Sequence, residues 1–226
     1  MFNLLSVFGV IDDTASKPLI IVSAIVIAIS ILILIAFSFR KKTFETKTLV
    51  FAGLTIATSF VLSFIKVKPV TYGGSITLCS MFAISLFAYC FGFLPALLVG
   101  IIYGFLQFFE GGAYIFNLAT FFLDYIFAFS SIVMMPLARK LFKGNKAFII
   151  GLSLTFLLRF IFHFTSGILY FVNGGIWANL PQDNAFIYSL LYQVTYLVPD
   201  YLLCLIVTLV LSKTKTLNKL VCLIEK

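Results

Sequence analysis

The chain has 226 residues, of which 62% are hydrophobic and 11% charged, and its mean hydropathy is +1.15. Soluble domains are about half apolar and about a quarter charged, so this composition excludes a soluble protein and indicates an integral membrane protein. The net charge of +8 does not indicate nucleic-acid binding, because the basic residues form short clusters beside apolar runs, without interleaved aromatic residues.

Seven apolar runs follow one another along the chain, and a membrane-spanning helix takes about 17 to 25 residues. They cover residues 18–38, 48–65, 75–91, 93–109, 116–137, 147–172 and 185–212. Only the sequence Phe-Gly-Phe around Gly92 separates the third run from the fourth, and we interpret them as two short spans rather than one re-entrant hairpin. The sequence therefore predicts an all-α, polytopic membrane helical bundle.

The first run, residues 18–38, does not fit a signal peptide. Asp12 and Asp13 precede it and the basic sequence "RKK" follows it, whereas a signal peptide has a basic front and a shorter apolar core. We expect a retained helix.

The distribution of Lys and Arg predicts the orientation. Three connecting segments on one side carry twelve such residues, and those on the other side carry three, namely Lys17, Lys66 and Lys68. Cytoplasmic loops are the ones enriched in Lys and Arg. We expect a multi-pass protein of the cell membrane, with its N-terminus outside and its C-terminus in the cytoplasm.

Four ionisable residues lie inside the predicted spans, where each costs about 2.5–3.5 kcal/mol on insertion scales and usually faces a cavity or a partner. They are Asp124, Arg159, His163 and Asp200.

Polar, small and aromatic residues recur at three- and four-residue spacing in the last three runs, so each helix carries one such stripe. The stripes consist of Asn117, Thr120, Asp124, Ala128 and Ser131; of Arg159, His163, Gly167 and Tyr170, with Phe171 alongside; and of Tyr188, Tyr192 and Tyr196, with Gln193 and Asp200 on a neighbouring line. We expect the three stripes to face one another.

Two interpretations of these stripes are open. In the first, Asp124 pairs with Arg159, His163 bonds to that pair, and the tyrosines belong to the interfacial belt. In the second, Asp124 and aromatic faces line a pocket open to the outside, which suits an organic cation because aromatic rings attract cations by roughly 2 kcal/mol when desolvated. A pairing of Arg159 with Asp200 would leave Asp124 available for such a ligand.

Small residues mark two further features. The pairs Gly73-Gly74, Gly111-Gly112 and Gly174-Gly175 fall in predicted exterior loops, where glycine permits tight turns at a pocket mouth. Gly53 and Ala57 form a small-xxx-small pattern in the second run, which lets another helix approach closely, either within the chain or from a partner.

Several chemical classes find no support. The sequence has no phosphate-binding P-loop, no GxSxG, one histidine, and four cysteines without CxxC spacing. We predict neither an enzyme, nor a metal site, nor a bound cofactor.

Four segments together resemble a known family. "YGGSITLCSM", "GGAYIFNLATFFLDYIFAF", "RFIFHFTSGILYF" and "IYSLLYQVTYLVPD" are similar to the thiamine-specific substrate-binding components of energy-coupling-factor (ECF) transporters, over about residues 48–212. The resemblance implies a six-helix bundle that binds thiamine with high affinity from outside. It also implies docking on a transmembrane coupling subunit driven by two cytoplasmic ATPase subunits.

The resemblance divides the chain into an additional N-terminal helix with a basic loop (1–47), a six-helix domain (48–213) and a cytoplasmic tail (214–226). It implies contact with the coupling subunit at Gly53 and Ala57. The expected ligand-binding residues are Asp124, Tyr125, His163, Gly167, Tyr188, Gln193, Tyr114, Phe171, Tyr170, Gly74 and Ser75.

Three of these positions depart from the family pattern. Phe171 replaces a tryptophan of some members, Gln193 replaces an asparagine, and Gly74 stands where some members have an aromatic residue. Two alternatives to a thiamine receptor are a receptor for a related precursor and an ion-coupled carrier that uses Asp124 and Asp200 as coupling groups.

Overall fold

The computed structural model describes residues 45–69, 74–110, 118–172 and 184–225. The predicted helix at 18–38 therefore lies outside the described residues. Among those described, five helical segments are long and apolar enough to cross a membrane: Thr46–Phe64, Phe93–Glu110, Leu118–Leu141, Gly144–Leu169 and Ala185–Lys213. Each corresponds to a predicted span, and the prediction of a membrane helical bundle is confirmed.

The first part of the bundle consists of three helices and a β-hairpin. Helix α3 (Thr46–Phe64) leads into strand β1 (Lys66–Pro69), which pairs antiparallel with β2 (Ser75–Thr77). Helix α4 (Ser80–Phe91) follows, and α5 (Phe93–Glu110) begins directly after Gly92.

The third predicted span, 75–91, is only partly helical, which corrects that prediction. Ser75–Thr77 form a strand, and Cys79 adopts a left-handed conformation with φ of 54° that separates the strand from α4. The twelve residues of α4 extend about 18 Å, short of the roughly 30 Å of hydrocarbon. The predicted break at Gly92 is present, with φ of 88°, a conformation that favours glycine.

The third long segment, Leu118–Leu141, is continuous but irregular. It contains α6 (Leu118–Phe121), the π-helix η2 (Phe122–Phe127), α7 (Ala128–Ser130), the 3₁₀ turn η3 (Ser131–Val133) and α8 (Met134–Leu141). Changes of helical type within one helix often mark functional positions, and here the π-helix contains Asp124.

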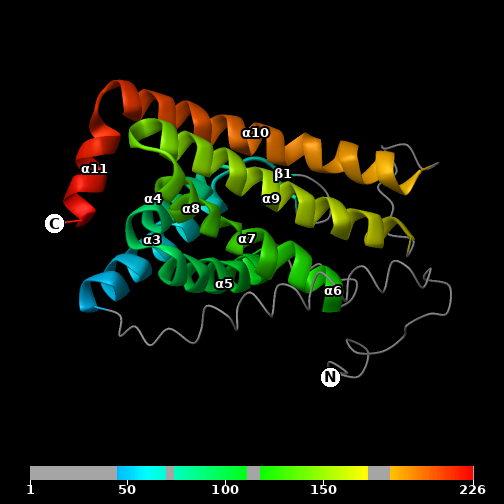
Figure 1. The fold of residues 1–226 in the computed structure, drawn as a ribbon. Helices are drawn as coiled ribbons and strands as arrows, with labels where there is room; N and C mark the ends of the chain where they lie inside the picture. Colours follow the sequence, from blue (N-terminus) through cyan, green and yellow to red (C-terminus); the bar gives the residue numbers. More distant parts are fainter. Residues whose placement is uncertain (1–44, 70–73, 111–117, 173–183, 226) are drawn as a thin grey trace.

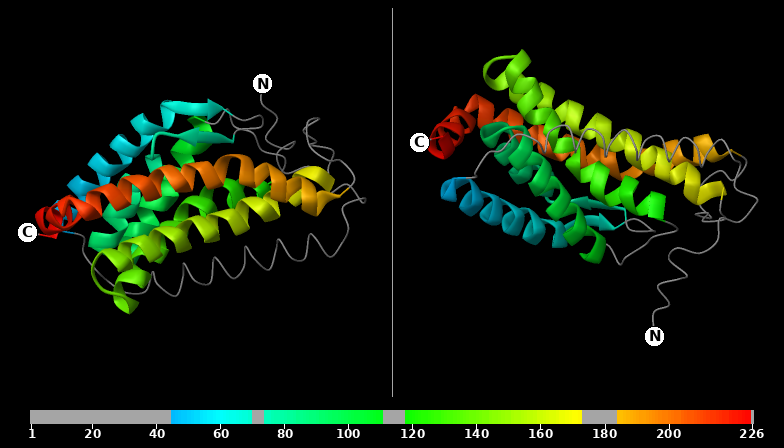
Figure 2. Two further views of the ribbon diagram at one scale, coloured as in Figure 1. Left: turned by 90° about the horizontal axis from the view of Figure 1, so that it is seen from above. Right: turned by 60° about the horizontal axis from the view of Figure 1, so that its bottom comes forward.

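Two long helices complete the bundle, and a short one closes its end. Helices α9 (Gly144–Val172) and α10 (Ala185–Lys213) lie side by side, as Figures 1 and 2 show. Asn184 is the N-cap of α10, because its side-chain oxygen accepts hydrogen bonds from the backbone N–H groups of Phe186 and Ile187 at 2.8 and 3.4 Å. The predicted tail contains a further helix, α11 (Thr216–Glu225), which turns across the end of the bundle and buries Leu217.

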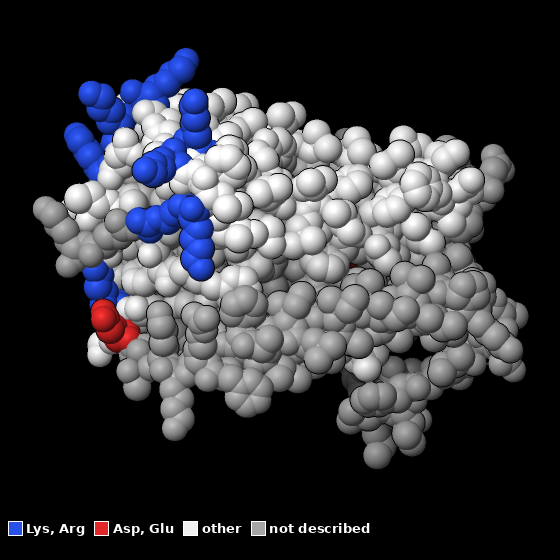
Figure 3. Space-filling model, in the orientation of Figure 1, with Lys and Arg blue, Asp and Glu red and all other residues white. Residues whose placement is uncertain are grey.

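Most of the described basic side chains gather at the end of the bundle that holds α11 and the connection between α8 and α9 (Figure 3). The described residues of this cluster include Lys47, Arg139, Lys140, Lys143, Lys146, Lys213, Lys215 and Lys219. Such a one-sided distribution is typical of the cytoplasmic end of a membrane protein.

Candidate functional site

Two glycines bring α5 close to the π-helix that carries Asp124. A Cβ atom at Gly104 would collide with the backbone oxygen of Tyr125, and one at Gly100 would lie 2.8 Å from the backbone oxygen of Phe129. Only residues without a side chain permit this approach of backbone to backbone. The packing of α5 therefore fixes the backbone of the irregular segment directly after Asp124.

The Asp124 carboxylate faces α9 and accepts two hydrogen bonds from it. His163 Nδ1 lies 2.9 Å from Asp124 Oδ1, and Ser166 Oγ lies 2.5 Å from Oδ2. His163 and Ser166 are three residues apart, so both point from one face of the helix. The Asp124 side chain retains 17% of its accessible surface, and it is therefore the less enclosed of the two carboxylates in this network.

Arg159 determines the protonation of His163. Its Nε–H points at His163 Nε2, 3.4 Å away. A nitrogen that accepts a hydrogen bond carries no proton, so the proton of the imidazole lies on Nδ1, which donates to Asp124. This arrangement makes His163 neutral.

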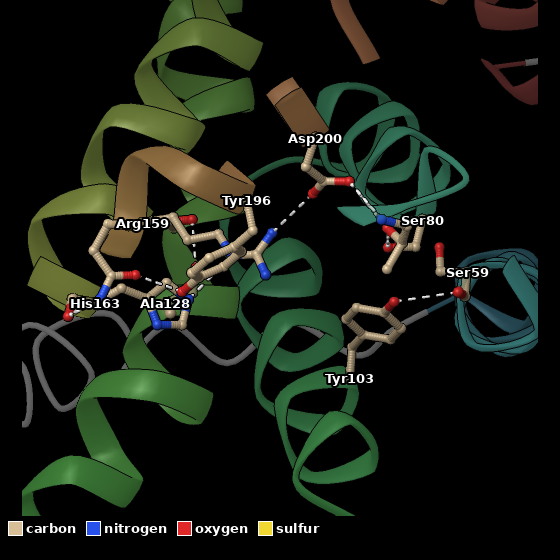
Figure 4. A network of polar contacts seen from close by, with 11 residues as sticks. Ser59, Ser80, Tyr103, Ala128, Arg159, His163, Tyr196 and Asp200 are labelled. Carbon is tan, nitrogen blue, oxygen red and sulfur yellow. Dashed lines mark hydrogen bonds and ion pairs between the residues drawn. The ribbon is translucent and has the colours of Figure 1, made fainter. Parts of the chain in front are cut away.

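The second carboxylate, Asp200, pairs with Arg159. Arg159 Nη1 lies 3.5 Å from Asp200 Oδ2, and Asp200 Oδ1 accepts from the backbone N–H and the hydroxyl of Thr77 at 3.3 and 3.0 Å. The guanidinium also stacks over the Phe129 ring, 4.5 Å from its centroid. Figure 4 shows Arg159 directed towards Asp200, with His163 on its other side. The arginine of the first interpretation thus pairs with Asp200 rather than with Asp124.

The tyrosine stripe of α10 lies inside the bundle. Tyr188, Tyr192 and Tyr196 are all buried, which argues against a position in the interfacial belt. The Tyr188 and Tyr192 rings are parallel with centroids 6.5 Å apart, and the His163 ring lies 6.0 Å from that of Tyr196. Aromatic faces therefore adjoin the polar network.

Gln193 connects the stripe to α9. Its Nε2 donates to the backbone oxygen of His163 at 2.9 Å, and its Oε1 accepts from the Tyr196 hydroxyl at 2.5 Å. A Cβ at Gly167 would collide with Ser189 Oγ, so the glycine allows α9 and α10 to touch at this level. Ser189 in turn donates to the backbone oxygen of Phe164 at 2.6 Å.

The structure brings together several of the predicted ligand-binding residues. Asp124, His163, Gly167, Gln193 and Tyr188 all lie where η2, α9 and the first half of α10 meet, so the described parts of the three predicted stripes do face one another. A Cβ at Gly74 would lie 3.0 Å from the Tyr192 hydroxyl, which places the start of the hairpin's second strand, with Ser75, beside this stripe.

The remaining predicted residues divide into three groups. The ring of Tyr125 packs edge-on against that of Phe108, 5.2 Å between centroids. Tyr114 lies outside the described residues, as do the side chains of Tyr170 and Phe171. Gly53 and Ala57 lie on an exposed face of α3, away from the polar network.

Sequence reasoning missed two residues of the network. Ser166 was absent from the expected set, although its position three residues after His163 provides a signal. Thr77 was read as part of an apolar span, and no pattern in the sequence indicates that it reaches Asp200, 123 residues away.

A helical bundle with five candidate spans and a buried cluster of ionisable groups is a polytopic membrane protein with an internal polar site, a class that includes transport proteins. Comparison with known families is more specific. Residues 49–220 match the family described as thiamine transporter protein (Thia_YuaJ), and the chain belongs to this family. It is thus a transport protein and not an enzyme.

A solved structure agrees with this assignment. ThiT from Listeria monocytogenes is similar with 25% sequence identity and a TM-score of 0.62, over 77% of this chain and 96% of that one. No curated protein matches the sequence. The predicted resemblance to thiamine-specific components is confirmed at the level of the family.

Proposed function

We propose that the protein is the thiamine-binding component of an ECF importer, which takes up thiamine with high affinity from the outer face of the cell membrane. The observation that carries this proposal is the partnership of Arg159 with Asp200, which leaves the Asp124 carboxylate without a cationic partner among the described residues. A buried carboxylate without a countercharge is costly, and a bound cation offsets that cost.

Thiamine fits the chemistry of the site. It carries a permanent positive charge on its thiazolium ring, and its aminopyrimidine ring is flat and offers hydrogen-bonding groups. The carboxylate of Asp124 supplies the opposite charge, and the tyrosines of α10 supply aromatic faces beside it. The site therefore combines the two kinds of group that bind an organic cation.

The position of the site supports access from outside. With the basic end of the bundle in the cytoplasm (Figure 3), α9 begins inside and ends outside. His163 lies nearer to the outer end of α9, Asp124 follows soon after the outer start of α6, and Tyr188 is in the first turn of α10. All three therefore lie in the outer half of the bundle.

The proposal predicts tight and selective binding. Purified protein in detergent, titrated with thiamine by calorimetry, is expected to show one saturable site with a dissociation constant of about 1 μM or lower. The neutral aminopyrimidine alcohol, which is half of thiamine, is expected to compete weakly because it lacks the thiazolium charge. Stronger binding of this alcohol than of thiamine would indicate a precursor receptor, and the absence of any saturable thiamine binding would refute the proposal.

Helix α3 supplies the face that we propose for the coupling subunit. Only 11% of its apolar stretch is buried, and Val50, Leu54 and Val61 are each more than half exposed. An added Cβ at Gly53 would have nothing within 4 Å, so no described residue packs against it. Small residues on an open apolar helix face allow a second helix to approach closely.

A bulky residue on this face is expected to block docking without affecting ligand binding. Gly53→Leu is predicted to lower recovery of the coupling subunit in co-purification by about tenfold, equivalent to about 1.4 kcal/mol, while thiamine affinity stays unchanged. Val210→Leu adds bulk at an exposed position of α10 and serves as the control. Equal recovery with Gly53→Leu and with the parent would exclude this face of α3.

A further inference from the structure

Asp200 is the most deeply buried charged group of the network, yet the proposed ligand site does not use it. Only 2% of its surface is accessible, and it lies one and two turns beyond Tyr196 and Gln193 on α10. Burial of an isolated carboxylate is strongly unfavourable. Here the ion pair with Arg159 and the hydrogen bonds from Thr77 offset this cost.

Hydrogen bonds connect five side chains of the network, and the two carboxylates at Asp200 and Asp124 only accept them. Thr77 donates to Asp200, Arg159 donates both to Asp200 and to His163, and His163 donates to Asp124. Because His163 is neutral in this arrangement, the described charges are two carboxylates and one guanidinium. The network thus carries one net negative charge, and that charge lies at the Asp124 end.

We propose that Asp200 is a positioning residue that sets the charge of the ligand site, because it holds the Arg159 guanidinium away from Asp124. The inference rests on the proposed function. It adds the reason why the site prefers a ligand with one positive charge, namely the single negative charge that remains at Asp124. Arg159 and His163 are four residues apart on one face of α9, so the guanidinium lies between the two carboxylates, with the imidazole ring on its Asp124 side. Because Asp200 accepts from the guanidinium directly, Arg159 neutralises Asp200 and not Asp124.

Loss of the Asp200 charge is expected to change both the net charge of the network and the position of the Arg159 side chain. In Asp200→Asn, the network becomes neutral without a ligand, and Arg159 loses its ionic partner. The long arginine side chain then becomes the nearest countercharge for Asp124. A thiamine molecule must compete with it, whereas a neutral ligand is affected much less.

The test is the ratio of two affinities in the full-length protein. An opposite charge a few ångströms from a carboxylate changes its affinity for a proton by about ten- to a thousandfold, so we expect Asp200→Asn to weaken thiamine binding by about tenfold or more relative to the neutral aminopyrimidine alcohol. A purely structural role would weaken both ligands alike. Thr208→Val, which removes a buried hydroxyl from the same helix without changing the charge, is expected to leave the ratio as in the parent.

A double variant separates the effect of charge from any misfolding of the Asp200→Asn protein. Arg159→Gln combined with Asp200→Asn removes both charges of the pair and leaves one negative charge at Asp124, so it is expected to recover the parental ratio of affinities. A parental ratio in Asp200→Asn, or no recovery in the double variant, would overturn the inference. If the parent itself fails to bind thiamine, the proposed function fails, and the two results are thereby distinguished.

Discussion

Asp124→Asn is expected to reduce thiamine affinity by a factor of about 30 to several thousand, because truncating one partner of a buried charge pair costs about 2–5 kcal/mol. The substitution keeps the size of the side chain and an oxygen that accepts from His163 Nδ1, so the packing between η2 and α9 is preserved. The change removes the charge and the hydrogen bond from Ser166 Oγ to Oδ2, because an amide NH₂ group cannot accept. Calorimetric titration measures the loss directly.

Two companion variants separate charge from hydrogen bonding. Asp124→Glu retains the negative charge, so we expect binding within about tenfold of the parent. Ser166→Ala removes a single hydrogen bond to the carboxylate and leaves its charge. An Asp124→Asn protein that binds thiamine as tightly as the parent would mean that another group compensates the thiazolium.

Periodicity in the sequence was sufficient to predict how the polar site is assembled. Apolar runs gave the long helices, and a stripe at three- and four-residue spacing must lie on one side of its helix. Three such stripes in consecutive spans face one another because exposure to lipid would be costly for all of them. His163 and Gln193 are thus adjacent in space as expected, although they come from different helices.

Features that depend on distant backbone contacts were not predictable in the same way. Gly104 brings α5 against the backbone of the π-helix at Tyr125, and Gly100 brings it against Phe129 of α7, whereas an apolar run gives no sign of its own helical type. The hairpin shortens α4 because Lys66–Pro69 pairs with Ser75–Thr77, which lies at the start of the predicted apolar run 75–91.

The partner of Arg159 illustrates the same limit. From the sequence, Asp124 and Asp200 were both possible partners of Arg159. Each lies in a predicted span, and its distance from Arg159 along the chain does not decide between them. The choice follows from Thr77, whose backbone N–H and hydroxyl fix Asp200 where the guanidinium reaches it. That contact joins the hairpin to α10, and only the folded chain contains it.

Arg159→Ala is expected to be the most destabilising single change in the network. Removing one partner of a buried ion pair costs about 3–5 kcal/mol, because the remaining charge is left without compensation. Here Asp200 would keep its two bonds from Thr77 but lose its only described cation, and the stacking of the guanidinium on Phe129 would also disappear. Thermal unfolding in detergent is expected to show a clearly lowered midpoint.

The double variant Arg159→Gln, Asp200→Asn distinguishes loss of a countercharge from loss of packing. Replacement of both partners of a buried pair by neutral groups is far less damaging than removal of one, so its unfolding midpoint is expected to lie between those of Arg159→Ala and the parent. If Arg159→Ala unfolds at the parental temperature and loses only affinity for thiamine, the arginine contributes to ligand binding rather than to the balance of buried charge. The role assigned to Asp200 would then be wrong as well, because both rest on the same ion pair between α9 and α10.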